Sequence, residues 1–103
     1  MEIKHVNEAN FVQEVVESDV PVLVDFYADW CGPCKMLSPT IEKIAKESNQ
    51  YKVVKINADE SNRLLSRYNV ASIPTLIVFH AGKEVNRSVG LVPKEQIVKM
   101  LAV

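Results

Sequence analysis

The run from Val22 to Tyr27 constrains the fold most, because it is apolar on both of its alternating faces except at Asp25. A strand with one face in water alternates apolar and polar residues, whereas a strand covered on both faces is a nearly continuous apolar run. We therefore expect Val22–Tyr27 to be a central strand between two layers. An ionised carboxylate is costly there, so we expect Asp25 either to be paired or to have a raised pKa.

The rest of the chain alternates strand and helix patterns. The further strands that we expect are Ile3–Val6, Lys52–Asn57, Thr75–His80 and Lys83–Val89. Only Ala81-Gly82 separates the last two, which forces an antiparallel hairpin. The pattern predicts an α/β fold in which a central mixed sheet of about five strands carries helices on both faces. A chain of 103 residues corresponds to a single domain, residues 1–103.

Four helices are expected between these strands. Asn7 is a suitable N-cap for the first, whose apolar pairs Phe11/Val15 and Val12/Val16 fall at i, i+4. The second runs from Cys31 to about Ser48, with a kink near Lys35–Pro39 and an apolar stripe at Leu37, Ile41, Ile44 and Ala45. A short third helix carries Leu64, Leu65 and Tyr68, and a last one begins at Pro93 with Ile97, Val98 and Leu101 facing inward.

Both cysteines, Cys31 and Cys34, lie where the central strand gives way to the long helix. Unpaired N–H groups and the helix dipole at a helix N-terminus favour a thiolate, and Pro33 suits the first turn of a helix. A C-x-x-C beside a βαβ pattern indicates a redox pair. Cys31 is then the nucleophile, and we expect it to be the exposed thiol. The alternatives are two buried cysteines or half of a zinc site, but only His5 and His80 could add zinc ligands.

Composition excludes several other classes of function. A formal net charge of −1 argues against nucleic acid or an acidic membrane as the main partner. No apolar run approaches the roughly 20 residues of a membrane span, and the N-terminus shows no secretory signal. Two cysteines without such a signal suggest a reducing compartment, so we expect a cytoplasmic protein.

The stretch Trp30–Lys35 resembles the active site of the thioredoxin family. The similarity continues through Val24–Phe26, Ile73–Thr75 and Val89–Gly90, in order along essentially the whole chain. It implies a thioredoxin fold and a monomeric dithiol–disulfide oxidoreductase that needs no cofactor. Such a protein reduces protein disulfides and is re-reduced by a flavoprotein thioredoxin reductase, which determines whether the electrons come from NADPH or ferredoxin.

The resemblance also implies roles for individual residues near the cysteines. Cys31 would attack the target disulfide and Cys34 would resolve the mixed disulfide, so the two form a redox-active disulfide. Gly32 and Pro33 tune the redox potential, and in the family this dipeptide goes with reductants. Asp25 would lie beneath Cys34 and relay its proton, with Lys55 nearby.

The same resemblance implies a docking surface for protein substrates. Its members would be Trp30, Ile73, Pro74, Val89 and Gly90. The family places a cis-proline at the position of Pro74, opposite the cysteines. This arrangement leaves the preceding backbone free to pair with an extended segment of a substrate.

Three other functions remain open at this point. The first is a thiol oxidase or isomerase on the same fold, against which Gly32-Pro33 argues. The second is a non-catalytic binding subunit, which a cysteine-free variant that keeps the activity would indicate. The third is a metal or iron–sulfur site between two chains, which a metal assay would detect.

Overall fold

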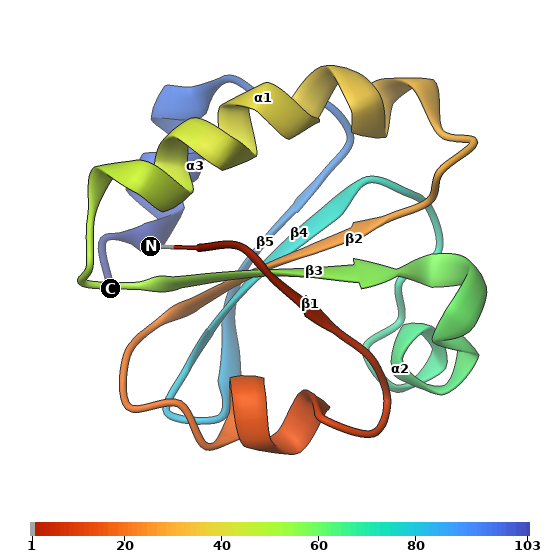
Figure 1. Ribbon diagram of the computed structural model, residues 1–103, viewed down its shortest axis with the longest axis horizontal. Helices are drawn as coiled ribbons and strands as arrows, with labels where there is room; N and C mark the ends of the chain where they lie inside the picture. Colours follow the sequence, from red (N-terminus) through yellow and green to blue (C-terminus); the bar gives the residue numbers. More distant parts are fainter. Residues whose placement is uncertain (1) are drawn as a thin grey trace.

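In the computed structural model, which describes residues 2–103, five strands form one sheet in the order β1-β3-β2-β4-β5 (Figure 1). The strand β2 is parallel to β3, which is parallel to β1, whereas β4 is antiparallel to β2 and to β5. This confirms the predicted mixed sheet. The strands are β1 (Lys4–Val6), β2 (Val22–Tyr27), β3 (Lys52–Asn57), β4 (Thr75–His80) and β5 (Lys83–Val89).

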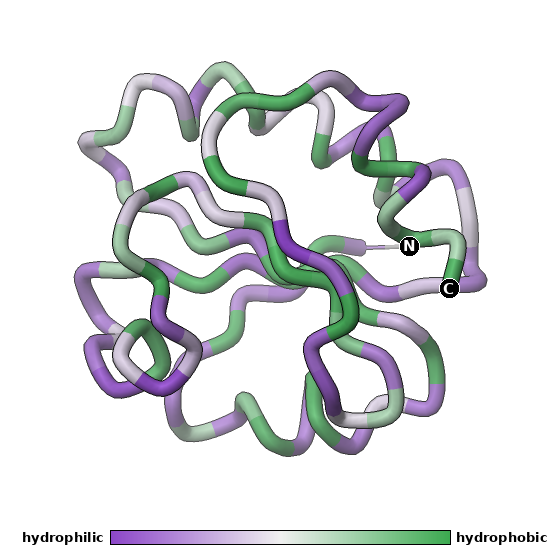
Figure 2. The backbone as a smooth tube through the Cα atoms, turned by 180° about the vertical axis from the view of Figure 1, so that it is seen from behind, coloured by the Kyte–Doolittle hydropathy of each residue, from purple (hydrophilic) through white to green (hydrophobic). Residues whose placement is uncertain are grey.

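Helices cover both faces of this sheet. The helices α1 and α3 lie on one face, and the π-helix η1 and the helix α2 lie on the other, η1 being the unlabelled orange coil in Figure 1. Green and purple alternate along the helices in Figure 2, because one side of each helix packs on the sheet and the other faces solvent. The bounds are η1 (Val12–Val16), α1 (Gly32–Glu47), the 3₁₀-helix η2 (Ala58–Glu60), α2 (Asn62–Arg67) and α3 (Lys94–Leu101).

The strand β2 is the central strand that the sequence predicts. Its first five residues are buried, and its side chains point alternately into two hydrophobic clusters. Leu23 packs with α1 and α3, whereas Val24 and Phe26 pack with η1 and α2. The continuous apolar run is thus explained by a layer on each side.

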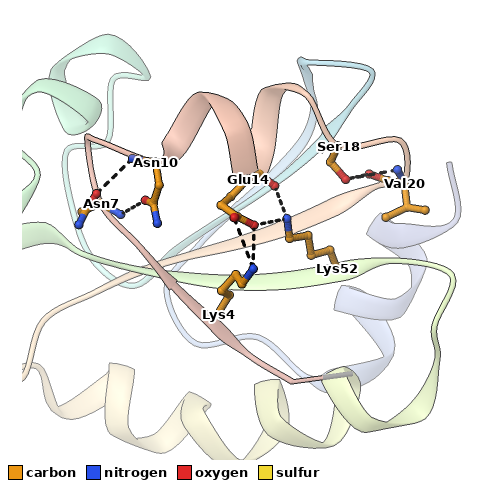
Figure 3. Close-up of polar contacts among 7 residues, drawn as sticks. All are labelled: Lys4, Asn7, Asn10, Glu14, Ser18, Val20 and Lys52. Atoms are coloured by element: carbon orange, nitrogen blue, oxygen red, sulfur yellow. Dashed lines mark hydrogen bonds and ion pairs between the residues drawn. The ribbon is translucent and has the colours of Figure 1, made fainter.

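The segment before β2 differs from the prediction of an ordinary helix. Asn7 does act as a cap, since its Oδ1 accepts from the backbone N–H groups of Ala9 and Asn10, but turns follow it and the regular part is a π-helix. The N–H of Glu17 donates to the carbonyl oxygen of Val12, five residues back. Tight turns at both ends of the segment, one at Asn7–Asn10 and one at Ser18–Val20, leave little room for a longer helix (Figure 3).

Glu14 bonds η1 to the sheet. The Lys52 ammonium donates to Oε1 of Glu14 over 2.6 Å and to its carbonyl oxygen over 2.7 Å, and Lys4 approaches the same carboxylate at 3.3 Å (Figure 3). The hydrogen bond from Lys52 lowers the pKa of the Glu14 carboxyl. Because Lys52 begins β3 while Cys31 follows the end of the parallel strand β2, this cluster lies at the opposite end of the sheet from the cysteines.

The two amphipathic helices on the other face largely match their predicted stripes. In α1 the predicted stripe is buried together with Cys34, and the helix runs without interruption through Pro39. In α3 the prediction for Val98 is wrong, because Val98 is 45% exposed whereas Met100 is buried. Ile97, Met100 and Leu101 lie at i, i+3 and i+4 and share one face, from which Val98 is turned by about 100°.

The packing of η1 leads to a stability prediction. Phe11 is fully buried with its ring 5.5 Å from that of Tyr68 and 5.7 Å from that of Phe79, so Phe11→Ala should lower the free energy of unfolding by about 3–5 kcal/mol. Its neighbour Val12 is 48% exposed, and Val12→Ala should change the free energy of unfolding by about 0.5 kcal/mol or less. Denaturant melts of both variants measure the difference. Equal losses would contradict this packing of η1.

Candidate active site

The two cysteines lie at the start of α1. Cys31 is the N-cap, with extended backbone dihedrals, and Gly32 and Pro33 form the first positions of the helix. A disulfide joins Cys31 and Cys34, whose Cα atoms are 5.2 Å apart. The backbone N–H of Cys34 donates to Sγ of Cys31 over 3.2 Å. The helix N-terminus thus directs a hydrogen-bond donor and its positive dipole end at this sulfur.

The prediction that Cys31 is exposed is wrong for this disulfide form. The Cys31 residue is only 4% exposed and Cys34 6%. Both pack with Ala28, and Ile73 lies against them from a loop that is distant in the sequence. The carbonyl oxygen of Ile73 is 3.9 Å from Sγ of Cys31. An exposed helix N-terminus was the basis of the prediction, and the packing of a second loop removes that exposure.

Two loops at the ends of neighbouring strands meet beside the disulfide. The peptide bond between Ile73 and Pro74 is cis, as the resemblance implied. Thr75 pairs with Val89 across β4 and β5, and the N–H of Gly90 donates to the carbonyl oxygen of Pro74 over 2.8 Å. Gly90 has a φ of +89°, a conformation that glycine adopts without steric cost. Strand pairing therefore brings four of the five predicted docking residues together.

Trp30, the fifth, directly precedes Cys31 in the chain and is 69% exposed. Its indole N–H donates to Oδ2 of Asp59 over 2.8 Å. A groove of about 430 Å³ opens beside this pair and reaches Ile73, with Leu65 and Val70 in its wall. Sequence reasoning missed Asp59, because nothing in the sequence shows that the loop after β3 approaches Trp30.

Asp25 is buried in the centre of β2. The residue is 2% exposed, and its Oδ1 has no hydrogen-bond partner. Burial raises the pKa of the Asp25 carboxyl from 3.8 to about 6, while the charge of Lys55 opposes this shift. Lys55 lies directly across from Asp25 in the register of β2 with β3. The expected raised pKa is thus confirmed.

A small hollow of about 130 Å³ lies next to Cys34 on the α1 side of the sheet. Tyr27, Asp29 and Lys55 line it together with Lys35 and other residues. The Lys55 ammonium lies 4.4 Å from the centre of the Tyr27 ring. Sequence reasoning assigned Tyr27 no part in the chemistry, although its spacing of two from Asp25 places both on the same face of the strand.

Within residues 2–103, no three His, Cys, Asp or Glu side chains are grouped so that they could hold a metal ion. None of the helices described is long and apolar enough to cross a bilayer.

A helix-capping cysteine pair that forms a disulfide next to a cis-proline, at the end of a mixed five-stranded sheet, defines a dithiol–disulfide oxidoreductase. Comparison with known proteins identifies the family. The thioredoxin family model matches residues 2–103. The chain therefore belongs to the thioredoxin family, and its fold is the thioredoxin fold.

Individual relatives support this assignment. The chain is 50% identical to thioredoxin 1 of Synechococcus elongatus over 97 residues, which cover 93% of this chain and 91% of the relative. It is 46% identical to a thioredoxin of Pyropia yezoensis over 102 residues, or 98% and 95% of the two chains. Among solved structures, a mutant thioredoxin from Halobacterium salinarum superposes with a TM-score of 0.89 at 38% identity, covering 97% of this chain and 88% of that one.

The burial of Asp25 leads to a prediction on stability and pH. Between pH 3.8 and about 6 the unfolded chain loses this proton before the folded protein does, so the free energy of unfolding falls as the pH rises. Asp25→Asn removes the penalty, which at about 1.4 kcal/mol per pKa unit amounts to at most about 3 kcal/mol. Urea melts should show the gain at about pH 7.5 and only a small part of it at about pH 4.

The exposed carboxylate of Asp29 serves as the matched control. Asp29→Asn should leave the free energy of unfolding within about 0.5 kcal/mol at both pH values. A gain in Asp25→Asn that is equal at both pH values, or a loss, would mean that Asp25 carries no desolvation penalty.

Proposed function

We propose that the protein reduces disulfides of other proteins, with Cys31 as the nucleophile and Cys34 as the resolving thiol. The observation that carries this proposal is the position of Sγ of Cys31 at the N-cap of α1, where the N–H of Cys34 donates to it. In the reduced protein the same donor and the helix dipole favour the Cys31 thiolate. Cys34 lies inside the first turn, within bonding distance of Cys31.

The exchange proceeds in two balanced steps. The Cys31 thiolate attacks one sulfur of the target disulfide, the target S–S bond breaks, and one target thiolate leaves. Cys34 then loses its proton and attacks Sγ of Cys31, which releases the second target thiolate and forms the Cys31–Cys34 disulfide. Two electrons have passed to the target. A flavoprotein thioredoxin reductase then supplies two further electrons, which reduce the Cys31–Cys34 disulfide again.

Asp25 is the proposed acid–base group for the second step. A base that accepts the Cys34 proton is most useful when its pKa lies near the working pH, and the pKa of about 6 fits this requirement better than the ordinary 3.8. The proton passes directly or through a water in the hollow beside Cys34. Lys55, which faces Asp25 across the strands, stabilises the carboxylate once it has lost its proton.

Substrates dock on the surface formed by Trp30, Ile73, Pro74, Val89 and Gly90. Trp30 and Val89 are 69% and 58% exposed, so each offers apolar contact area. An extended target segment pairs with the backbone near Ile73, next to the sulfur of Cys31. Contacts of this kind accept many different sequences, as a general disulfide reductant requires.

The direction of the reaction follows from Gly32 and Pro33. Neither residue carries a charge that would stabilise the Cys31 thiolate further, so the disulfide is not made more oxidising. A function as a reductant is therefore favoured over a function as an oxidase or isomerase. Equilibration with glutathione at graded ratios tests this, since an oxidase would remain reduced where a reductant is already oxidised.

We further propose that residues 1–103 form one domain that works as a monomer in the cytoplasm.

Substitution of the two cysteines tests the assigned roles. Cys31→Ser should abolish the reduction of a protein disulfide such as that of insulin, because no nucleophile remains. Cys34→Ser should instead accumulate a mixed disulfide with the target, because the intermediate is not resolved. Non-reducing electrophoresis and mass mapping distinguish the two results.

Alkylation of the reduced protein provides an independent check. Limiting iodoacetamide should label Cys31 before Cys34, as peptide mapping would show, because the thiolate is the reactive form. Preferential labelling of Cys34, or a mixed disulfide trapped on Cys34, would reverse the assignment.

A further inference from the structure

The ammonium of Lys55 is held by an aromatic ring instead of by a carboxylate. Lys55 faces Asp25 in the strand register, yet Oδ1 of Asp25 has no hydrogen-bond partner. The Lys55 Nζ lies 4.4 Å from the centre of the Tyr27 ring, well within the range of a cation–π interaction. Both side chains are half-buried and line the hollow next to Cys34.

We propose that Tyr27 is a positioning residue for disulfide exchange, whose ring holds the Lys55 ammonium in the hollow beside Cys34, within electrostatic reach of the Asp25 carboxylate. This rests on the proposed proton transfer between Asp25 and Cys34. A lysine side chain is flexible, and its ammonium is strongly hydrated, so without a partner it moves toward water. The open side of the hollow offers Lys55 that path, and the ring of Tyr27 opposes it.

The charges around the hollow indicate that the position of the Lys55 ammonium depends on the Tyr27 ring. The titratable and charged groups that face Tyr27 and Lys55 come from β1, β2, the loop after β2, α1 and η2, and they are His5, Asp25, Asp29, Cys34, Lys35 and Glu60. Asp29 and Glu60 are exposed, so they attract the ammonium outward, away from Asp25. The ring is the one described contact that holds Lys55 on the inner side.

The position of Lys55 sets the charge balance at Asp25. The ammonium lowers the pKa of the buried carboxyl and partly offsets desolvation. When the ammonium swings outward, the carboxyl holds its proton to a higher pH, and less of it is available as a base for Cys34 near neutral pH. Tyr27 acts on the reaction through Lys55 and does not itself exchange a proton.

The experiment follows the Asp25 carboxyl by carbon NMR across a pH titration of the disulfide form, in which neither cysteine titrates. In Tyr27→Leu the midpoint of the Asp25 titration should rise by about 0.5 pH unit, since the loss of a nearby charge shifts the pKa of a buried group by this order. Tyr27→Phe, which keeps the ring, should leave it unchanged. Lys55→Gln should raise it at least as much, and adding Tyr27→Leu to Lys55→Gln should produce no further change.

Two controls separate positioning from general damage. Histidine changes charge between about pH 5 and 8, and the His5 ring lies 6.4 Å from that of Tyr27, so the titrations are repeated with His5→Gln. Should Tyr27→Leu fail to fold, Tyr27→Met, also without a ring, takes its place. The pH profile of mixed-disulfide resolution by Cys34 should shift in the same direction as the carboxyl titration.

The outcomes distinguish the positioning role of Tyr27 from the proposed proton transfer between Asp25 and Cys34. An Asp25 midpoint in Tyr27→Leu that stays unchanged or falls would overturn the positioning role. So would a rise that persists in the Lys55→Gln background, because the ring would then act without Lys55. If instead Asp25→Asn resolves the mixed disulfide as fast as the parent protein, the proton transfer itself fails, even where the titrations behave as expected.

Discussion

The structure depends on the pairing of β2 with a parallel strand on one side and an antiparallel strand on the other. Both edges of this strand are paired and both of its faces are covered, and just beyond its end Cys31 caps α1. The register that sets Phe26 opposite Thr75 carries Pro74 to the same end, and the pairing of Thr75 with Val89 adds Gly90. Backbone pairing between strands thus brings these loops together at one end of the sheet.

The same strand contains the one group that works against its stability. Asp25 occupies a position where an apolar residue would stabilise the core, and its Oδ1 has no hydrogen-bond partner. Proteins commonly break a folding rule at a functional site and compensate elsewhere. Here the compensation lies in the two apolar clusters on either side of the sheet, to which Leu23, Val24 and Phe26 contribute. Burial raises the pKa of the Asp25 carboxyl to about 6, and the proposed proton transfer depends on this shift.

The sequence predicts the elements whose periodicity is strong. The bounds of β2 through β5 follow from apolar or β-branched runs and from the short gap between the last two strands, and the buried stripe of α1 follows from its helical spacing. The π-helix η1 does not, because its geometry depends on turns and on Lys52, which is distant in the sequence. The sequence also could not predict the burial of Cys31 or the contact of Trp30 with Asp59, because both depend on loops brought together by tertiary structure.

The position of Trp30 has a spectroscopic consequence. It is the only tryptophan of the chain, and it lies at the proposed docking surface, mostly exposed, instead of in the core. Its fluorescence therefore reports on the neighbourhood of the disulfide and on whatever covers it. A target that binds there changes the emission directly, without an attached dye. For the same reason the emission says little about the hydrophobic clusters, and global unfolding is better followed by circular dichroism.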